Sequence, residues 1–260
     1  MDAVRKVVIT MGGTESGWSR HNDEGVFRDY QKEAERLAES AKKFDIEAII
    51  YNNDFIKNLP YYNAHKDILE KVSFGFAYKA ICLYETMKNL DNGDIVIWAD
   101  SNHVIDKDPQ VFIDVAIMCG MFCRNHIWVY YPQKDWCRRD TFVNMGCDNE
   151  YYWNSFQHQD NIFVICKNEM TMEFATEWKN YCLDYKTMFG ENKYENFPSF
   201  KHHRHNQAIF SILCHKYKFP YFDRTQNVWG EYIIPEIDGI APENPVDNSY
   251  RMEEDRKDNK

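Results

Sequence analysis

The first half of the chain alternates short apolar runs with amphipathic stretches. Three apolar runs have the length of buried strands, at residues 5–10, 46–51 and 95–97. Between and after them, apolar residues recur at three- and four-residue steps, as on the buried face of a helix: Phe27, Tyr30, Ala34, Leu37, Ala38 and Ala41, then Ala77, Ile81, Tyr84 and Met87. A third helix is expected to start at Asp108 and Pro109. This order predicts an α/β fold with a mainly parallel central sheet, right-handed crossovers and flanking helices.

The second half is richer in aromatic residues. Strands are expected at 127–131 and 162–166, and the segment 202–207 opens a last helix. Phe174, Trp178, Tyr181 and Tyr185 form an aromatic stripe at helical spacing, which favours the core over a sugar platform. We expect one domain over residues 1–240, with a nucleotide-binding half at about 1–105 and an acceptor-side half at about 106–240, followed by a polar tail at 241–260.

Composition narrows the function classes. The 260 residues carry a net charge of −10, which argues against a nucleic-acid partner. No apolar run is long enough for a membrane span, and the first residues do not resemble a signal peptide. The eight cysteines include no C-x-x-C pair, so we expect reduced thiols and a cytoplasmic location, in a bacterium or a virus-infected host.

Polar residues follow each of the first three apolar runs. These are Thr10, Met11, Gly12 and Gly13, then Asn52, Asn53 and Asp54, then Asp100 and Asn102. Ligands of parallel sheets bind outside the carboxyl ends of the strands, so this pattern indicates a nucleotide site. Asp100 and Asn102 lie two residues apart and can offer two oxygen ligands to a divalent cation that grips a diphosphate. An ordinary turn with Asp and Asn explains the same residues equally well.

An ordered set of short motifs extends this picture. It comprises the segments 74–79 (F-G-F-A-Y-K), 91–94 (D-N-G-D), 98–100 (W-A-D), 138–142 (R-R-D-T-F), 177–178 (E-W) and 203–207 (H-R-H-N-Q). Over about residues 5–220 the chain resembles the small GT-A-type glycosyltransferases of bacteria and large DNA viruses, among them capsid-glycan transferases that add xylose. The resemblance implies a nucleotide-sugar donor, uridine-linked and UDP-xylose in the narrowest reading, and a glycan or glycoprotein acceptor.

The resemblance also implies roles for individual residues. Nucleotide contacts fall on Thr10, Met11, Gly12, Asn53, Lys79 and Asp100, and donor-sugar contacts on His203, Arg204, Asn206 and Gln207. A divalent metal, Mn²⁺ or Mg²⁺, falls on Asp100 and Asn102. Two positions depart from the family pattern: Asn102 stands where many members have a second Asp, which puts metal dependence in doubt, and Asn206 stands in place of an Asp and cannot act as a base.

Several mechanisms stay open at this point. An inverting transferase needs a carboxylate base, for which Asp140 and Asp148 are the candidates, although Asp140 can equally pair with Arg138 or Arg139. A retaining enzyme needs no such base and can use Gln207 or the leaving phosphate. His202, His203 and His205 suggest a metal-dependent hydrolase, but they lack the H-E-x-x-H spacing. A non-catalytic nucleotide- or glycan-binding protein on the same fold is the other alternative.

Overall fold

The computed structural model describes residues 4–13, 29–125, 132–222 and 233–235. Its strands are β1 (Lys6–Met11), β2 (Glu47–Tyr51), β3 (Ile95–Ala99), β4 (His103–Ile105), β5 (Met121–Asn125), β6 (His158–Cys166), β7 (Tyr221–Phe222) and β8 (Ile233–Pro235). The longer helices are α1 (Tyr30–Lys42), α4 (Tyr78–Lys88), α5 (Gln110–Cys119), α9 (Glu169–Cys182) and α11 (Asn206–Lys216). Short helices are α2 (Asn53–Lys57), α3 (Lys66–Leu69), α6 (Gln133–Trp136), α7 (Arg139–Asn144), α8 (Glu150–Trp153) and α10 (Tyr185–Phe189), with 3₁₀ turns η1 (Tyr62–His65) and η2 (Val72–Phe76).

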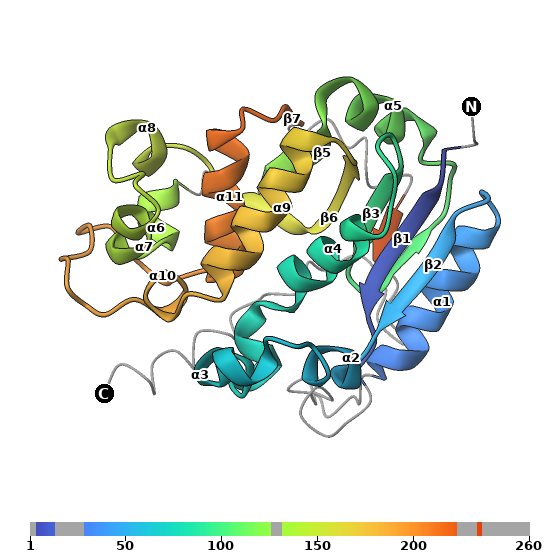
Figure 1. The fold of residues 1–260 in the computed structure, drawn as a ribbon. Helices are drawn as coiled ribbons and strands as arrows, with labels where there is room; N and C mark the ends of the chain where they lie inside the picture. Colours follow the sequence, from blue (N-terminus) through green and yellow to red (C-terminus); the bar gives the residue numbers. More distant parts are fainter. Residues whose placement is uncertain (1–3, 14–28, 126–131, 223–232, 236–260) are drawn as a thin grey trace.

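The central sheet has the strand order β2-β1-β3-β6-β5-β7 in the described part of the chain (Figure 1). Strands β2, β1 and β3 are parallel to one another, and so are β5 and β7. Strand β6 alone is antiparallel to both of its neighbours, β3 and β5. The predicted α/β architecture with a mainly parallel sheet is therefore confirmed, with one reversed strand at its centre.

Two apolar cores cover the two faces of this sheet. Alternate residues of a strand point to opposite faces, so Val96 and Trp98 of β3 belong to one core, and Ile95 and Ile97 to the other. Helices α4, α9 and α11 cover the first face, and helices α1 and α5 cover the second (Figure 1). Because β3 is covered on both faces, its sequence is a continuous apolar run.

The predicted elements agree with the observed ones within a few residues. The first helix begins at Tyr30, because the side chain of Asp29 accepts a hydrogen bond from Lys32 N at 3.0 Å and caps it; Phe27 lies outside the described residues. The strand expected at 162–166 begins four residues earlier, at His158. The segment expected as a strand at 127–131 and the tail at 241–260 lie outside the described residues.

The aromatic stripe divides between two helices. Phe174 and Trp178 of α9 are fully buried in the core, as expected. Tyr181 is half-buried, and Tyr185 starts the separate helix α10, where 39% of its surface is exposed. The expectation of a core stripe therefore holds for the first two residues and is wrong for Tyr185.

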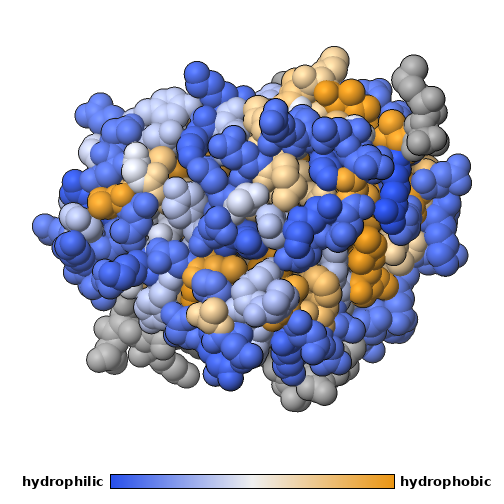
Figure 2. Space-filling model, in the orientation of Figure 1, coloured by the Kyte–Doolittle hydropathy of each residue, from blue (hydrophilic) through white to orange (hydrophobic). Residues whose placement is uncertain are grey.

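Helix α5 is apolar on both sides. Its inner residues Phe112 and Ile113 pack against the sheet, whereas Val111, Ile117 and Met118 are exposed, and Figure 2 shows apolar surface over this helix. The helix begins one residue later than expected, at Gln110, whose N–H donates to Asp108 Oδ1 at 3.0 Å. Among the described residues, no helix is both long and apolar enough to cross a membrane.

Candidate active site

The candidate site lies where β3 ends and β6 begins. Because the two strands are antiparallel, Ala99 pairs with Ile162, and Asp100 N donates to Asn161 O at 2.9 Å. This pairing brings Asp160, a residue 60 positions away in the sequence, to the edge of the sheet where Asp100 lies. The reversed strand β6 thus adds a second carboxylate to the carboxyl end of β3.

Lys79 connects these two carboxylates. Its ammonium group lies 2.9 Å from Asp100 Oδ1 and 3.4 Å from Asp160 Oδ1, and it donates to Asp160 O at 3.2 Å. Lys79 is 6% exposed, and a buried cation is stable only when anions surround it. Burial opposes its charge, but Asp100 and Asp160 outweigh burial and raise the pKa of Lys79 above its ordinary value. Helix α4 therefore begins with an ammonium ion held charged at the sheet edge.

Asp100 is the accessible member of the group. Its side chain is 32% exposed, and its Oδ1 accepts a second hydrogen bond from Trp98 Nε1 at 3.0 Å. Burial opposes a charge on Asp100, but Lys79 outweighs it and lowers the pKa of Asp100. Two carboxylates and one ammonium leave a net charge of −1 near neutral pH, so the group favours a further cation.

The start of α11 completes the group. Asn206 Nδ2 donates to Asp160 Oδ2 at 2.5 Å, and Gln207 Nε2 donates to His158 O at 2.9 Å. We call Lys79, Asp100, Asp160 and Asn206 the sheet-edge cluster. It brings together Lys79, Asp100 and Asn206, which the sequence singled out, with Asp160, which it did not. The missed signal was a charged residue two positions before the apolar run 162–166.

His203 and Arg204 are engaged elsewhere. The ring of His203 is buried between two backbone groups: Nδ1 accepts from Arg138 N at 3.2 Å, and Nε2 donates to Met188 O at 3.0 Å. Burial, together with the charges of His205 and Arg138, lowers the pKa of His203 well below its ordinary value, so the ring is neutral. The guanidinium of Arg204 lies 5.0 Å from the ring centre of Trp136. Their expected contact with a donor sugar stays a prediction.

The ends of β1 and β2 carry unpartnered polar atoms. Thr10 and Asn53 are 2% and 7% exposed, and neither Thr10 Oγ1 nor Asn53 Oδ1 has a hydrogen-bond partner among the described residues. Buried polar atoms of this kind usually have a partner, so a ligand or water is expected there. Met11 is buried in the core, and Gly12 N donates to Tyr51 O at 2.8 Å, which joins the two strand ends.

Gly12 marks a close approach of chain segments. A Cβ at this position would lie 2.4 Å from Gln31 Oε1 and 3.0 Å from Ile50 Cγ2. A larger residue would therefore require the side chain of Gln31 to rotate away and that of Ile50 to shift slightly. The glycine leaves room for these side chains, and a direct nucleotide contact by its backbone stays a prediction.

The expected metal ligands lie in the turn after β3. Asn102 is partly exposed, and its neighbours are anchored: Ser101 Oγ donates to Glu33 Oε2 at 3.2 Å, and His103 Nδ1 lies 3.0 Å from Asp100 O. Within the described ranges, no group of three or more His, Cys, Asp or Glu residues is arranged to hold a metal ion. Asp100 and Asn102 carry oxygen atoms of the type that a hard divalent cation prefers, and their expected role as metal ligands stays a prediction.

Asp140 and Asp148 both have local partners. Asp140 is buried, and its Oδ1 accepts from Lys193 N at 3.1 Å and Tyr194 N at 3.3 Å. Asp148 pairs with Arg139 at 3.3 Å and accepts from Trp153 Nε1 at 2.9 Å. These bonds indicate structural roles, and the expected catalytic role of either residue stays a prediction.

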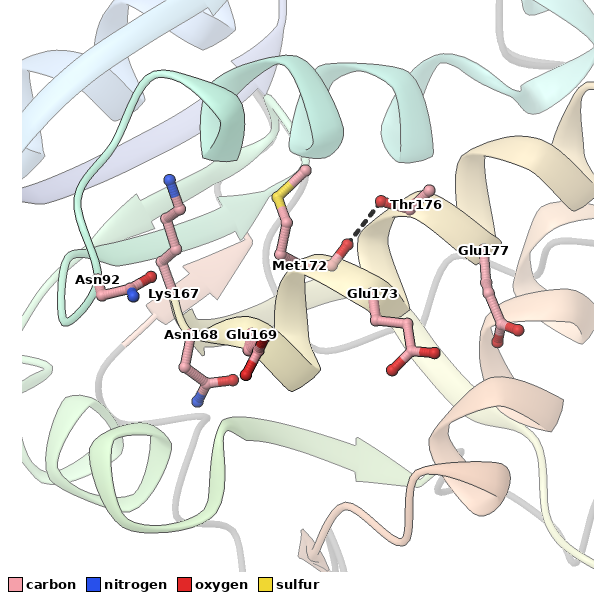
Figure 3. A pocket seen from close by; sticks show the side chains of 8 residues that line it. All are labelled: Asn92, Lys167, Asn168, Glu169, Met172, Glu173, Thr176 and Glu177. Atoms are coloured by element: carbon pink, nitrogen blue, oxygen red, sulfur yellow. Dashed lines mark hydrogen bonds between the residues drawn. The ribbon is translucent and has the colours of Figure 1, made fainter.

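A groove of about 610 Å³ lies elsewhere, along the outer side of α9. Figure 3 shows that its lining side chains diverge: Lys167 and Met172 extend to one side, and Glu169, Glu173 and Glu177 to the other. The ammonium group of Lys167 already donates a hydrogen bond to Leu90 O. Because the polar groups do not converge, the groove lacks the arrangement that the sheet-edge cluster has.

Comparisons with known proteins give structural neighbours only. No protein-family model and no curated protein matches the chain. The chain is similar to mouse xyloside xylosyltransferase 1 in its apo form, with 11% identity, a TM-score of 0.47 and 86% of each chain covered. It is also similar to a glycosyltransferase involved in the glycosylation of the major capsid of PBCV-1, with 10% identity, a TM-score of 0.42, and 88% of this chain and 92% of that chain covered.

A third similarity is to the apo-form glycosyltransferase GlyE of Streptococcus pneumoniae TIGR4, with 11% identity and a TM-score of 0.40. That alignment covers 94% of this chain and 57% of GlyE, so the chain spans little more than half the length of that protein. At these identities and TM-scores the neighbours share a similar course of the backbone and do not assign the chain to a family.

Proposed function

We propose that the protein is a GT-A-like glycosyltransferase that moves a sugar from a nucleoside-diphosphate donor to a hydroxyl group of a glycan acceptor. The observation that carries the proposal is the sheet-edge cluster. An ammonium ion held between two carboxylates, one of them accessible, lies at the carboxyl end of β3. Ligands of α/β sheets bind at this edge, and the buried, unpartnered atoms of Thr10 and Asn53 lie at the ends of the neighbouring strands.

The nucleoside is assigned to the ends of β1 and β2. Thr10 Oγ1 and Asn53 Oδ1 can bond to a base or ribose, and we assign the backbone at Met11 and Gly12 to the same site. We assign uridine as the nucleoside, in keeping with the ordered motifs of the chain. A UDP-pentose such as UDP-xylose is the narrowest form of this proposal, and UDP-hexoses are its alternative.

The diphosphate is assigned to the turn after β3. A divalent cation bound there by Asp100 and Asn102 would neutralise the charge that builds on the leaving diphosphate. Lys79 lies between the carboxyl groups of Asp100 and Asp160 and lowers the pKa of Asp100. Lys79 therefore acts by setting the charge of the site, and a direct contact of Lys79 with phosphate stays a prediction.

The donor sugar is assigned to Asp160, Asn206 and Gln207. Asn206 binds one oxygen of Asp160 and Lys79 the other, and we assign the carboxyl group held in this way to the positive charge that develops at the anomeric carbon. An inverting reaction needs a base for the acceptor hydroxyl, for which Asp140 and Asp148 stay candidates and Asp160 joins them. A retaining reaction needs none, and the stereochemistry is left open.

A non-catalytic binding protein is the second candidate function. The observation that favours it is that Lys79 already neutralises one of the two carboxylates at the site. The hydrolase alternative has less support: the ring nitrogens of His203 are bonded to Arg138 N and Met188 O. A cytoplasmic location stays a prediction.

A thermal-shift series with UDP, with and without Mn²⁺, tests the nucleotide site. We expect UDP to raise the melting temperature of the wild type. Thr10→Val should fold normally, because its hydroxyl makes no hydrogen bond to a described residue, yet it should lose much of the UDP-induced shift. If UDP raises the melting temperature of Thr10→Val as much as that of the wild type, the nucleoside does not bind at this end of β1.

Release of UDP from a panel of UDP-sugars tests catalysis. We expect slow hydrolysis of one donor by the wild type and none by Asp100→Ala with its fold intact by circular dichroism. Wild-type binding of UDP without any release from the panel would favour the binding protein. Full turnover by Asp100→Ala would contradict the role of the sheet-edge cluster.

A further inference from the structure

Two segments near the sheet-edge cluster have unusual backbone conformations. Phe74, Gly75 and Phe76 are three consecutive residues with positive φ angles, of 51°, 58° and 64°. His205 has φ 45° and ψ −122°, a combination that favours glycine. Residues other than glycine hold such conformations only where the surrounding structure enforces them, and they gather at functional sites.

The side chains of these segments meet. The ring centres of Phe76 and His205 lie 5.2 Å apart, and those of Phe189 and His205 lie 5.4 Å apart. A Cβ on Gly75 would lie 3.1 Å from Phe189 Cζ, so the glycine allows the contact with α10. Phe76, Phe189 and His205, which we call the aromatic rim, are each partly exposed. Three segments that are distant in sequence thus bring partly exposed rings together at one place.

The aromatic rim adjoins the sheet-edge cluster through the chain itself. Phe76 precedes Lys79 by three residues at the start of α4, and His205 directly precedes Asn206 at the start of α11. A Cβ on Gly190, the residue after Phe189, would lie 3.0 Å from Asp140 Oδ2. The segments that carry the aromatic rim are thus continuous in sequence with two members of the cluster, and the chain after Phe189 packs close to Asp140.

The chemistry of the rim suits a carbohydrate. Partly exposed aromatic rings bind the C–H face of a pyranose, and neighbouring polar side chains bond to its hydroxyls. Lys71 adds a charge here, with its ammonium group 5.0 Å from the ring centre of Phe189 and 5.4 Å from that of Tyr185.

We propose that the aromatic rim is the acceptor subsite, where Phe76 and Phe189 stack on the accepting sugar and His205 bonds to it. The inference rests on the proposed function, because it places the acceptor next to a donor at the sheet-edge cluster. The backbone at 74–76 and at His205, with its positive φ angles, accompanies the contact between these rings. In this view His205 retains a strained conformation because its side chain is required.

The variant His205→Gly separates strain from recognition. Glycine adopts this backbone conformation freely, whereas alanine keeps the strain. We therefore expect the melting temperature of His205→Gly to equal or exceed that of His205→Ala. Both variants should show an acceptor KM at least tenfold above that of the wild type. A merely structural His205 would instead lose stability in both variants without a change in acceptor KM.

The decisive experiment measures transfer and donor hydrolysis together. The probes are UDP-sugars as donors and a panel of p-nitrophenyl glycosides as acceptors, and the readout is the ratio of transfer to hydrolysis. We expect this ratio to fall at least tenfold in Phe76→Leu and His205→Gly. Tyr151→Leu, which removes an aromatic side chain that is 57% exposed on α8, should leave the ratio unchanged.

The outcomes distinguish this inference from the proposed function. If the ratio stays at the wild-type value in Phe76→Leu and His205→Gly, the aromatic rim is not the acceptor subsite, and the proposed transferase function is unaffected. A wild type that hydrolyses a donor but binds no glycoside in saturation-transfer NMR overturns it as well. If the wild type turns over no donor, the proposed function fails, and NMR binding of a glycoside that Phe76→Leu abolishes would still support a sugar subsite at the rim.

Discussion

Two regions of this protein carry buried or half-buried carboxylates, and the structure uses them differently. In the sheet-edge cluster, Asp100 and Asp160 share the single ammonium ion of Lys79, and Asp100 stays accessible. In the segment after α6, Asp140 bonds to two backbone N–H groups and Asp148 pairs with Arg139. Surplus negative charge at a sheet edge is a poor way to stabilise a fold, whereas matched local bonds are a good one.

This contrast identifies the sheet-edge cluster as the candidate site and the segment with Asp140 and Asp148 as part of the structural scaffold. Both regions were selected from the sequence because they contain Asp in motif-like surroundings. The partners of each carboxylate, more than its residue type, decide whether it is available for chemistry. The tests that follow try to break this contrast.

The largest effect is expected at Asp160. Asp160→Asn keeps the size of the side chain but removes the charge that we assign to the developing positive charge on the sugar. We expect donor turnover to fall by at least about 100-fold, measured as UDP release. Asp114→Asn, at an exposed position on α5, is the matched control and should turn over donor at the wild-type rate. Equal rates of UDP release in the two variants would show that Asp160 does not take part in turnover.

The second test concerns the charge balance of the cluster. Lys79→Met leaves Asp100 and Asp160 without their shared cation, and we expect the free energy of unfolding to fall by about 3 kcal/mol in urea titrations. Lys88→Met on the same helix removes an exposed lysine and should change it by less than about 0.5 kcal/mol. The double variant Lys79→Met, Asp160→Asn should regain part of the loss. If the double variant is no more stable than Lys79→Met, Lys79 stabilises the fold by packing alone.

The third test asks whether Asp140 belongs to the scaffold. Asp140→Ala leaves Lys193 N and Tyr194 N without their acceptor, so we expect a loss of about 1–3 kcal/mol in the free energy of unfolding. Asp140→Asn keeps an acceptor oxygen and should retain transfer within about fivefold of the wild type, since the charge is not needed for those bonds. A fall in transfer of about 100-fold or more in Asp140→Asn, with donor hydrolysis intact, would instead make Asp140 the catalytic base.

The smallest effect is expected from pH. His203 is buried and neutral, and its pKa lies well below its ordinary value, so the unfolded chain binds a proton that the folded chain does not. Stability should therefore fall as the pH drops below about 6.5, by at most about 1.4 kcal/mol per pH unit for this residue. His215, whose pKa burial also lowers, adds to the same slope. His203→Gln should flatten the slope, and an unchanged slope would show that His203 is protonated in the folded protein.

The sheet-edge cluster itself should add little to that slope. The lowered pKa of Asp100 gives a stabilisation that is present above about pH 4 and is lost only as the pH falls toward its folded pKa. The raised pKa of Lys79 gives one that is present below about pH 10 and is lost only in stronger base. The pH dependence near pH 6 thus reports on the scaffold rather than on the candidate site.

The sequence by itself determined the strands β1, β2 and β3 and the helices between them, because continuous apolar runs and helical spacing of apolar residues are properties of short segments. It also selected Lys79, Asp100 and Asn206, three of the four members of the sheet-edge cluster. Asp100 was selected by its place at the end of a strand, whereas Lys79 and Asn206 were selected by the motifs that carry the resemblance.

Only the tertiary structure decided which of the selected residues meet. The reversal of β6 brought Asp160 beside Asp100, and no local pattern specifies the direction in which a strand joins a sheet. The same long-range packing placed the ring of His203 between Arg138 and Met188, away from the cluster, and gave Asp140 its backbone partners. Contacts between distant segments depend on the whole core, so a residue's chemistry can be read from the sequence well before its partners can.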